Sequence, residues 1–240
     1  MNVRIFRIAA GAAALAGLVS LASCQQFFTG SLAKALARDS YTIPSDISMD
    51  DAVELLAGGD ADVAAALVSP LSAAVSAGTP GTASYDEAAT ALVTAVVLSS
   101  DASPAIFSIV EELGTSGLDV LSPEQVDSAI ASLMAISLTP GETAALLLVS
   151  DDAAAPSGLA PDQLYVAALT LAVDAFNDAG VAVTSYADLS ILLDTGTNPA
   201  AVDDATIAGA IALLALAQAA ETASGTTSIF GQLLSGMSFE

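Results

Sequence analysis

The chain contains no histidine and no tryptophan, and its single cysteine is Cys24. One cysteine cannot form a disulfide within the chain. Histidine is the side chain that most often serves as general acid or base and as a metal ligand, so its absence removes those common catalytic arrangements. Carboxylates, hydroxyls and four tyrosines remain as groups able to carry chemistry. We therefore expect a non-catalytic protein without a cofactor or a bound metal.

Positive charge is nearly absent as well. Four Lys and Arg stand against 27 Asp and Glu, and none follows Arg38. Nucleic-acid phosphates and anionic lipid surfaces are bound through clustered Lys and Arg. The composition therefore predicts that the protein binds neither.

A short apolar run lies near the start of the sequence. Residues 8–19 follow Arg4 and Arg7 and lead into Leu21-Ala22-Ser23-Cys24. This run is too short to cross a hydrocarbon layer of ~30 Å. The basic start, the apolar run, the leucine, the small residues and the cysteine together resemble the lipobox of bacterial lipoproteins.

In that family the chain is cut just before the cysteine, the thiol takes a diacylglycerol, and the freed amine is usually acylated. The resemblance thus implies a signal peptide at residues 1–23, lipidation of Cys24, and a membrane-proximal segment at residues 24–46. Two or three fatty-acid chains give a stable anchor at ~0.8 kcal/mol per buried methylene. Gln25, where Asp would resemble an inner-membrane retention signal, favours the outer membrane facing the periplasm over the inner membrane.

The remaining chain is apolar without a clear membrane span. Its longest smoothly apolar stretch, residues 205–220, is about 16 residues long and falls short of the ~20 that a spanning helix needs. Much of the hydropathy comes from alanine, which has the best helix propensity. After cleavage, Lys34 and Arg38 would stand against the 27 acids, a net charge of −25.

A 38-residue register begins at residue 47. The repeated features are helix starts: Ser84 to Glu87 and Ser122 to Gln125 fit capping boxes, and Asn198-Pro199 supplies a cap and a first-turn proline. Ala160-Pro161 keeps the proline but lacks a capping side chain. The units would begin at Ile47, Tyr85, Pro123, Pro161 and Pro199.

Each unit continues with a turn and a second apolar segment. The second segments are residues 61–75, 105–113, 142–149, 186–193 and 228–234. We predict an all-α fold of about five helical hairpins over residues 47–240, because a hairpin cannot bury its apolar face alone and must stack on its neighbours. An α-solenoid and a compact bundle both satisfy this pattern. The period resembles those of helical-repeat families such as tetratricopeptide proteins, although the tetratricopeptide signature residues are missing.

Most acids are expected at helix starts. The pairs at residues 50–51, 151–152 and 203–204 are candidates for catalysis or for Mg²⁺ or Ca²⁺ binding. First helical turns, however, favour negative charge by ~0.3–1 kcal/mol. Gly59-Asp60-Ala61-Asp62 does not complete a calcium loop, so we interpret it as a helix cap.

Asp174 and Asp178 are the candidate ligand-binding residues, because they lie four apart on an otherwise apolar helix. Two like charges on one face are unfavourable unless water surrounds them or a cation bridges them. Aspartate is usually exposed, which favours a solvated face. Some of the aromatic residues are expected in the core, with a ligand groove as the alternative; they are Phe107, Tyr165, Phe176, Tyr186 and Phe230.

Two functions remain. The lipobox, the repeats and the missing catalytic residue types predict a lipid-anchored, non-catalytic scaffold in the bacterial cell envelope, which binds a protein partner or forms a homo-oligomer. The alternative is an accessory solute-binding or transport component. It rests on the resemblance to lipid-anchored helical-repeat proteins, including the subunit associated with some TRAP transporters.

Overall fold

The computed structural model describes residues 43–44, 46–100, 102, 128, 131–152, 155–184, 202–225, 228 and 231. The described part is all-α, with no strand among its residues. Cys24 and the segments at residues 1–23 and 24–42 lie outside it, as do the unit starts at Pro123 and Pro199. Of the aromatic residues expected in the core, Phe107, Tyr186 and Phe230 also lie outside it.

The first unit is a helical hairpin, as predicted. Helix α3 spans Met49–Ala57 after the N-cap Ser48, and α4 spans Ala61–Ala77 after the N-cap Asp60. Gly59 in the turn between them has a φ of 68°, which glycine adopts without steric penalty. The Oδ1 atom of Asp60 accepts the N–H groups of Asp62 and Val63 at 3.0 and 3.2 Å. The cap interpretation of residues 59–62 is therefore confirmed.

Helix α5 spans Ala83–Ser99, and its cap differs from the predicted one. The sequence favoured a capping box at Ser84, whereas the helix begins one residue before Ser84, with Thr82 as N-cap. The Thr82 hydroxyl accepts the N–H of Tyr85 at 3.4 Å. Gly81, with a φ of 80°, turns the chain just before the cap, so the helix can begin earlier.

Helices α8 and α9 begin at prolines. Helix α8 spans Pro140–Ser150 and has a complete capping box between Thr139 and Glu142. Helix α9 spans Pro161–Asp178, starting at the predicted proline. Ala160 offers no capping side chain, as expected, but the side chain of Gln163 accepts the backbone N–H of Ala160 at 2.9 Å. Proline at the first helical position sacrifices no hydrogen bond.

Helix α11 spans Asp204–Ser224, with Asp203 as N-cap and Gly225 as a left-handed C-cap. The Oδ2 atom of Asp203 accepts both the N–H and the hydroxyl of Thr206, at 3.0 and 2.6 Å. The acids at residues 50–51, 60–62 and 203–204 thus lie at helix starts, where the helix N-terminus favours negative charge.

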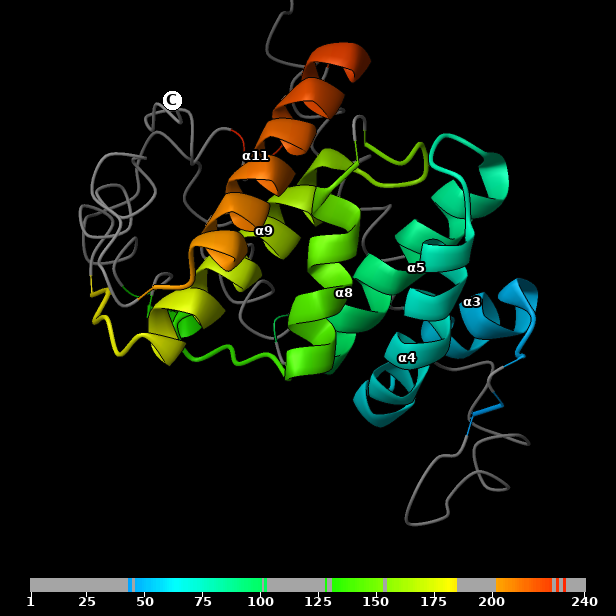
Figure 1. Ribbon diagram of the computed structural model, residues 1–240, viewed down its shortest axis with the longest axis horizontal. Helices are drawn as coiled ribbons and strands as arrows, with labels where there is room; N and C mark the ends of the chain where they lie inside the picture. Colours follow the sequence, from blue (N-terminus) through cyan, green and yellow to red (C-terminus); the bar gives the residue numbers. More distant parts are fainter. Residues whose placement is uncertain are drawn as a thin grey trace, which may run out of the picture.

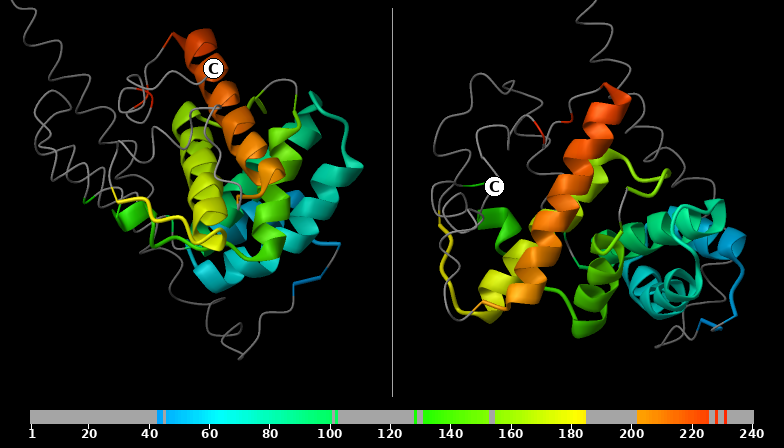
Figure 2. Two further views of the ribbon diagram at one scale, coloured as in Figure 1. Left: turned by 60° about the vertical axis from the view of Figure 1, so that its left-hand side comes forward. Right: turned by 45° about the horizontal axis from the view of Figure 1, so that its top comes forward.

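Helix α8 lies between two helix pairs (Figures 1 and 2). Helices α4 and α5 pack on each other on one side of α8, with α3 against them, and α9 and α11 pack on each other on the other side. Contacts between α4 and α8, α5 and α9, and α8 and α11 join units that are not consecutive in the register. A solenoid mainly joins consecutive repeats, so the described helices form a compact bundle.

The core is built from small and aliphatic side chains. Every residue of α9 from Leu164 to Phe176 is buried, and Tyr165 and Phe176 are among the largest fully buried side chains. Their predicted core placement is confirmed. Burial of a Leu or Phe side chain contributes about 1.5–3 kcal/mol to stability, and alanines between them let the helix axes approach.

Among the described helices, α11 has the length and apolar composition to cross a membrane. It also packs along α9 and α8, with 44% of its most apolar window buried in the bundle. A core helix of this kind has the same composition as a membrane span, so its hydropathy is explained by its place in the bundle.

Gly209 sets the distance between α11 and its neighbours. A Cβ atom at this position would clash with the Leu147 side chain, and would lie 3.1 Å from the Oγ atom of Ser150 and 3.3 Å from Leu171. We expect Gly209→Val to lower the free energy of unfolding by about 1–3 kcal/mol through overpacking. Ala208→Val, on the exposed face of the same helix, controls for the lower helix propensity of valine. Urea unfolding monitored by circular dichroism compares the two variants, and equal destabilisation would contradict the close approach.

Candidate functional site

Asp174 lies where the last turns of α9 meet the start of α8. Its side chain is 5% exposed. The Oδ1 atom accepts the backbone N–H of Leu138 at 2.8 Å, and Oδ2 accepts the hydroxyl of Thr143 at 3.0 Å. The expectation of a solvated face is therefore wrong for Asp174 and correct for Asp178, which is exposed. One turn of helix separates a buried carboxylate from a solvated one.

A second buried carboxylate, Glu142, lies on the first turn of α8 and is also 5% exposed. Its Oε2 atom accepts the N–H and the hydroxyl of Thr139 at 2.7 and 2.8 Å. Its Oε1 atom accepts the hydroxyl of Ser99 at the end of α5. Glu142 therefore completes the cap of its own helix and also ties that helix to α5.

The chain segment before α8 is held by the same end of α9. The side-chain amide of Asn177 donates to the carbonyl oxygens of Met134 and Ile136, each at 3.1 Å. With the Asp174 bond to Leu138, these contacts hold residues 134–138 in place beside the α9 C-terminus. We call the set of Asp174, Thr143, Leu138 and Asn177 the α8–α9 clasp.

Burial is the main cause that raises the pKa of Asp174 above its ordinary value. The hydrogen bonds from Leu138 and Thr143 favour the charged form and act in the opposite direction, while the charges of Asp178 and Glu142 raise the pKa further. The described residues include no Lys or Arg that could neutralise this carboxylate. The negative charge of Asp174 must therefore be stabilised by hydrogen-bond donors alone.

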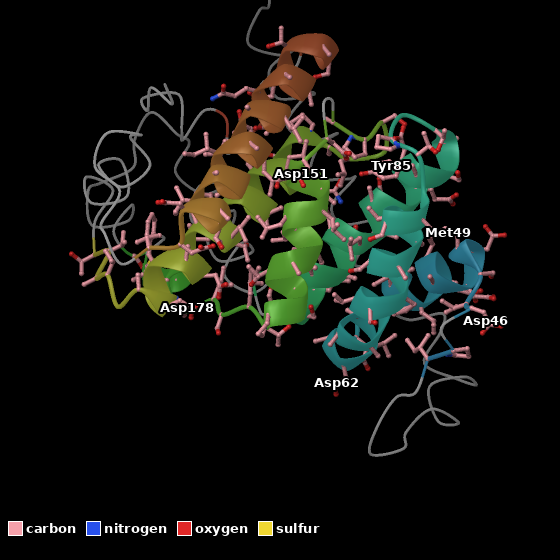
Figure 3. The ribbon with its side chains drawn as sticks, viewed as in Figure 1. Asp46, Met49, Asp62, Tyr85, Asp151 and Asp178 are labelled. Atoms are coloured by element: carbon pink, nitrogen blue, oxygen red, sulfur yellow. The ribbon has the colours of Figure 1, made fainter. Side chains whose placement is uncertain are left out.

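The opposite end of the bundle holds another carboxylate group (Figure 3). The Tyr85 hydroxyl, near the start of α5, donates to Oδ1 of Asp152 at 2.6 Å, just after α8 ends. The Ser157 hydroxyl donates to Asp86 at 2.6 Å. Burial raises the pKa of Asp152, and burial followed by the hydrogen bond to Asp152 raises the pKa of Tyr85. The two ends of α5 are thus joined to the α8 region by hydroxyl-to-carboxylate bonds.

Helices α9 and α11 are joined in the same way. The Tyr165 hydroxyl donates to Oε2 of Glu221 at 3.0 Å, and the N–H of Ser228 donates to Oε1. Burial alone would raise the pKa of Glu221, but the hydrogen bonds from Ser228 and Tyr165 outweigh it and lower the pKa. Glu221 therefore fixes both the helix pair and the chain that follows α11.

Among the described residues, bonds of this type connect different parts of the bundle, and each has a hydroxyl donor and a carboxylate acceptor. They join Tyr85 to Asp152, Ser99 to Glu142, Ser157 to Asp86, Thr143 to Asp174, and Tyr165 to Glu221. Hydrogen bonds to charged groups contribute about 1.5–3 kcal/mol each. The sequence drew attention to Asp174 but not to its partners, because Thr143 lies 31 residues away and Leu138 lies 36 residues away.

The described residues contain no group of three or more acidic, histidine or cysteine side chains placed to hold a metal ion. Asp178 is exposed at the edge of the bundle (Figure 3), whereas Asp174 is buried, so the two do not form one site. The sequence candidates therefore divide into one structural carboxylate and one surface carboxylate.

No family model, curated protein or solved structure matches the chain.

The clasp leads to a test of Asp174. We expect Asp174→Ala to lower the free energy of unfolding at pH 7 by about 1–3 kcal/mol, because the Leu138 N–H and the Thr143 hydroxyl lose their acceptor. Asp178→Ala, one turn away and exposed, should change it by less than about 0.5 kcal/mol. Urea unfolding of both variants beside the wild type measures the difference. Similar values for the two variants would show that Asp174 has no structural role.

Proposed function

We propose that the protein is a lipid-anchored, non-catalytic component of the bacterial cell envelope, whose helical bundle binds a protein partner. The lipobox at Leu21-Ala22-Ser23-Cys24 supports the anchor. The bundle begins at Met49, so residues 24–48 connect it to Cys24. The proposed location is the outer membrane, with the bundle in the periplasm.

The absence of catalysis is proposed from the roles that the acids already have. Asp51 accepts the hydroxyl of the N-cap residue Ser48 at the start of α3, Asp60 and Asp203 cap α4 and α11, and Glu142 completes the cap of α8. A catalytic carboxylate needs a reacting group within hydrogen-bond distance. The observation that carries the non-catalytic proposal is that structural hydrogen bonds occupy both oxygens of the buried carboxylates Glu142 and Asp174.

Surface charge indicates the chemistry of the partner. Exposed acids such as Asp46, Asp62 and Asp178 lie at the edges of the bundle (Figure 3), and no Lys or Arg lies among the described residues. A second copy would carry the same charge and would be repelled, whereas a basic protein surface would be attracted over about 10 Å at 0.1 M ionic strength. We therefore propose a partner with a basic surface in preference to a homo-oligomer. The solute-binding alternative stays a prediction from the sequence.

The anchor is tested by mass spectrometry of the N-terminal peptide. The wild-type protein, expressed in a bacterium with lipoprotein processing, should begin at Cys24 and carry diacylglycerol and an amide-linked fatty acid. Cys24→Ala should keep residues 1–23 and lose these lipids, whereas Ser23→Ala, which retains a small residue in the lipobox, should still be processed. A wild-type protein that retains residues 1–23 and carries no fatty acid would contradict the proposal.

The partner is tested by affinity purification of the full-length protein from detergent-solubilised membranes. A stoichiometric basic partner should be recovered at 0.1 M NaCl and released at 1 M NaCl, where charge attraction extends only about 3 Å. The control is the variant Asp46→Asn, Asp62→Asn, Asp178→Asn, which should recover less partner without a change in helical content. Recovery of the protein alone as a monomer would contradict the proposed interaction, and recovery of a homo-oligomer would favour self-assembly.

A further inference from the structure

The Thr143 hydroxyl lies between two oxygen acceptors. It is 3.0 Å from Oδ2 of Asp174 and 3.2 Å from the carbonyl oxygen of Thr139. A hydroxyl carries one proton and can also accept a hydrogen bond. Thr143 can therefore donate to one of these oxygens at a time, and the choice depends on whether Asp174 carries a proton.

With Asp174 ionised, Thr143 must donate toward the carboxylate. The charge is then buried at 5% exposure and is stabilised by two donors, the Leu138 N–H and the Thr143 hydroxyl. Among the described residues, the charges near Asp174 are all negative. Glu142 faces it from α8 and Asp178 lies on the same helix, while α11 brings Asp203 and Asp204 to this end of the bundle (Figure 1). The ionised state therefore combines burial with like-charge repulsion.

With Asp174 protonated, the same atoms form a continuous set of hydrogen bonds. The Oδ2–H group donates to Thr143, the Thr143 hydroxyl donates to the Thr139 carbonyl, and Oδ1 still accepts the Leu138 N–H. Asp174 then carries no buried charge, and each of its polar atoms keeps a partner. While the clasp is closed, the same heavy-atom positions serve both states. The two states differ in the cost of keeping the carboxylate away from water, which the ionised form bears and which opening of the clasp relieves.

We propose that the α8–α9 clasp is a proton-operated contact, which is tightest when Asp174 is protonated and weakens when Asp174 ionises. The clasp holds residues 134–138 against the end of α9 through Leu138, with Asn177 binding the carbonyl oxygens of Met134 and Ile136. Ionisation would therefore loosen the segment that leads into α8. This proposal does not depend on the lipid anchor or on the protein partner.

The sign follows from proton linkage. Burial raises the pKa of Asp174 above its ordinary 3.8, so between these two pKa values the folded protein binds more protons than the unfolded chain. The stability that this group contributes is fully present below pH 3.8 and is lost as pH rises through the raised pKa. Most carboxylates in ion pairs behave in the opposite way, because pairing lowers their pKa.

The test compares wild type with Asp174→Asn between pH 4 and pH 8, using full-length protein in mild detergent. Asparagine resembles the protonated carboxyl: its oxygen can accept the Leu138 N–H, and its amide can donate to Thr143. As pH rises, the Tm of the wild type should fall relative to that of Asp174→Asn, by about 3–5 °C for each pH unit that separates the folded and unfolded pKa. Asp178→Asn serves as the matched control, and should follow the wild type.

Hydrogen exchange at the Leu138 amide gives a local measurement. Its protection, corrected for the intrinsic rate, should fall by up to about tenfold per pH unit across the transition, while protection at Leu67 in the core of α4 should not follow the same curve. Thr143→Ser should retain this response, because it keeps the hydroxyl. Thr143→Val should reduce Leu138 protection at acid pH, because it removes the acceptor for the Asp174 proton.

The proposal would be overturned if the Tm curves of wild type and Asp174→Asn ran parallel over the whole range. If Asp174→Asn failed to fold, the pH dependence of hydrogen-exchange protection at the Leu138 and Leu67 amides of the wild type would test the proposal by itself. Equal pH dependence of protection at the two amides would then reject the proton-operated contact.

Discussion

The hydrogen bond from a hydroxyl to a carboxylate is the interaction on which the polar part of this bundle depends. Beyond Arg38 the chain has no cation, so a buried carboxylate cannot form a salt bridge with another part of the bundle. An unpaired buried charge is costly. Tyr85, Tyr165 and Thr143 supply O–H donors across helix boundaries in place of Lys and Arg. Backbone N–H groups supply the other hydrogen-bond donors to these carboxylates.

This constraint also explains where the bonds lie. A Ser or Thr hydroxyl reaches less far than the side chain of Lys or Arg, so its carboxylate partner must lie close to its backbone. The bonds therefore occur at helix ends, where a free backbone N–H can add a second donor. Glu142 has a donor of each kind: it accepts the backbone N–H of Thr139 at the start of its own helix and the hydroxyl of Ser99 from α5. Capping and tertiary contact are combined in one side chain.

In the apolar core, the sizes of the side chains determine how closely the helices pack. Alanine allows helices to approach, and Gly209 leaves room for side chains of α8 and α9 where a Cβ atom would clash. Large residues such as Tyr165 and Phe176 fill the space that remains around α9. The polar bonds at the helix ends then select one arrangement among those that such uniform alanine-rich faces permit, since hydrogen bonds are directional and apolar packing is not.

Local sequence signals predicted much of the fold and little of the site. Helix class, the proline start of α9 and the cap at Asp60 depend on neighbours within four residues, so periodicity and capping rules identify them. The start of α5 was misplaced because both Thr82 and Ser84 can cap, and the geometry of Gly81 decides between them. The exposure of Asp174 depends on Thr143 and Leu138, which periodicity within one helix cannot reveal. The choice between solenoid and bundle likewise depends on contacts between distant units.

The lack of cations also determines how the chain can be cut. Trypsin-like peptidases cleave after Lys or Arg, and the last such residues are Lys34 and Arg38. Both precede Met49, where the first described helix begins. Such a peptidase can separate the N-terminal segment from residues 39–240, but it has no cleavage site within them. The bundle would therefore be released from the N-terminal segment as one uncut polypeptide.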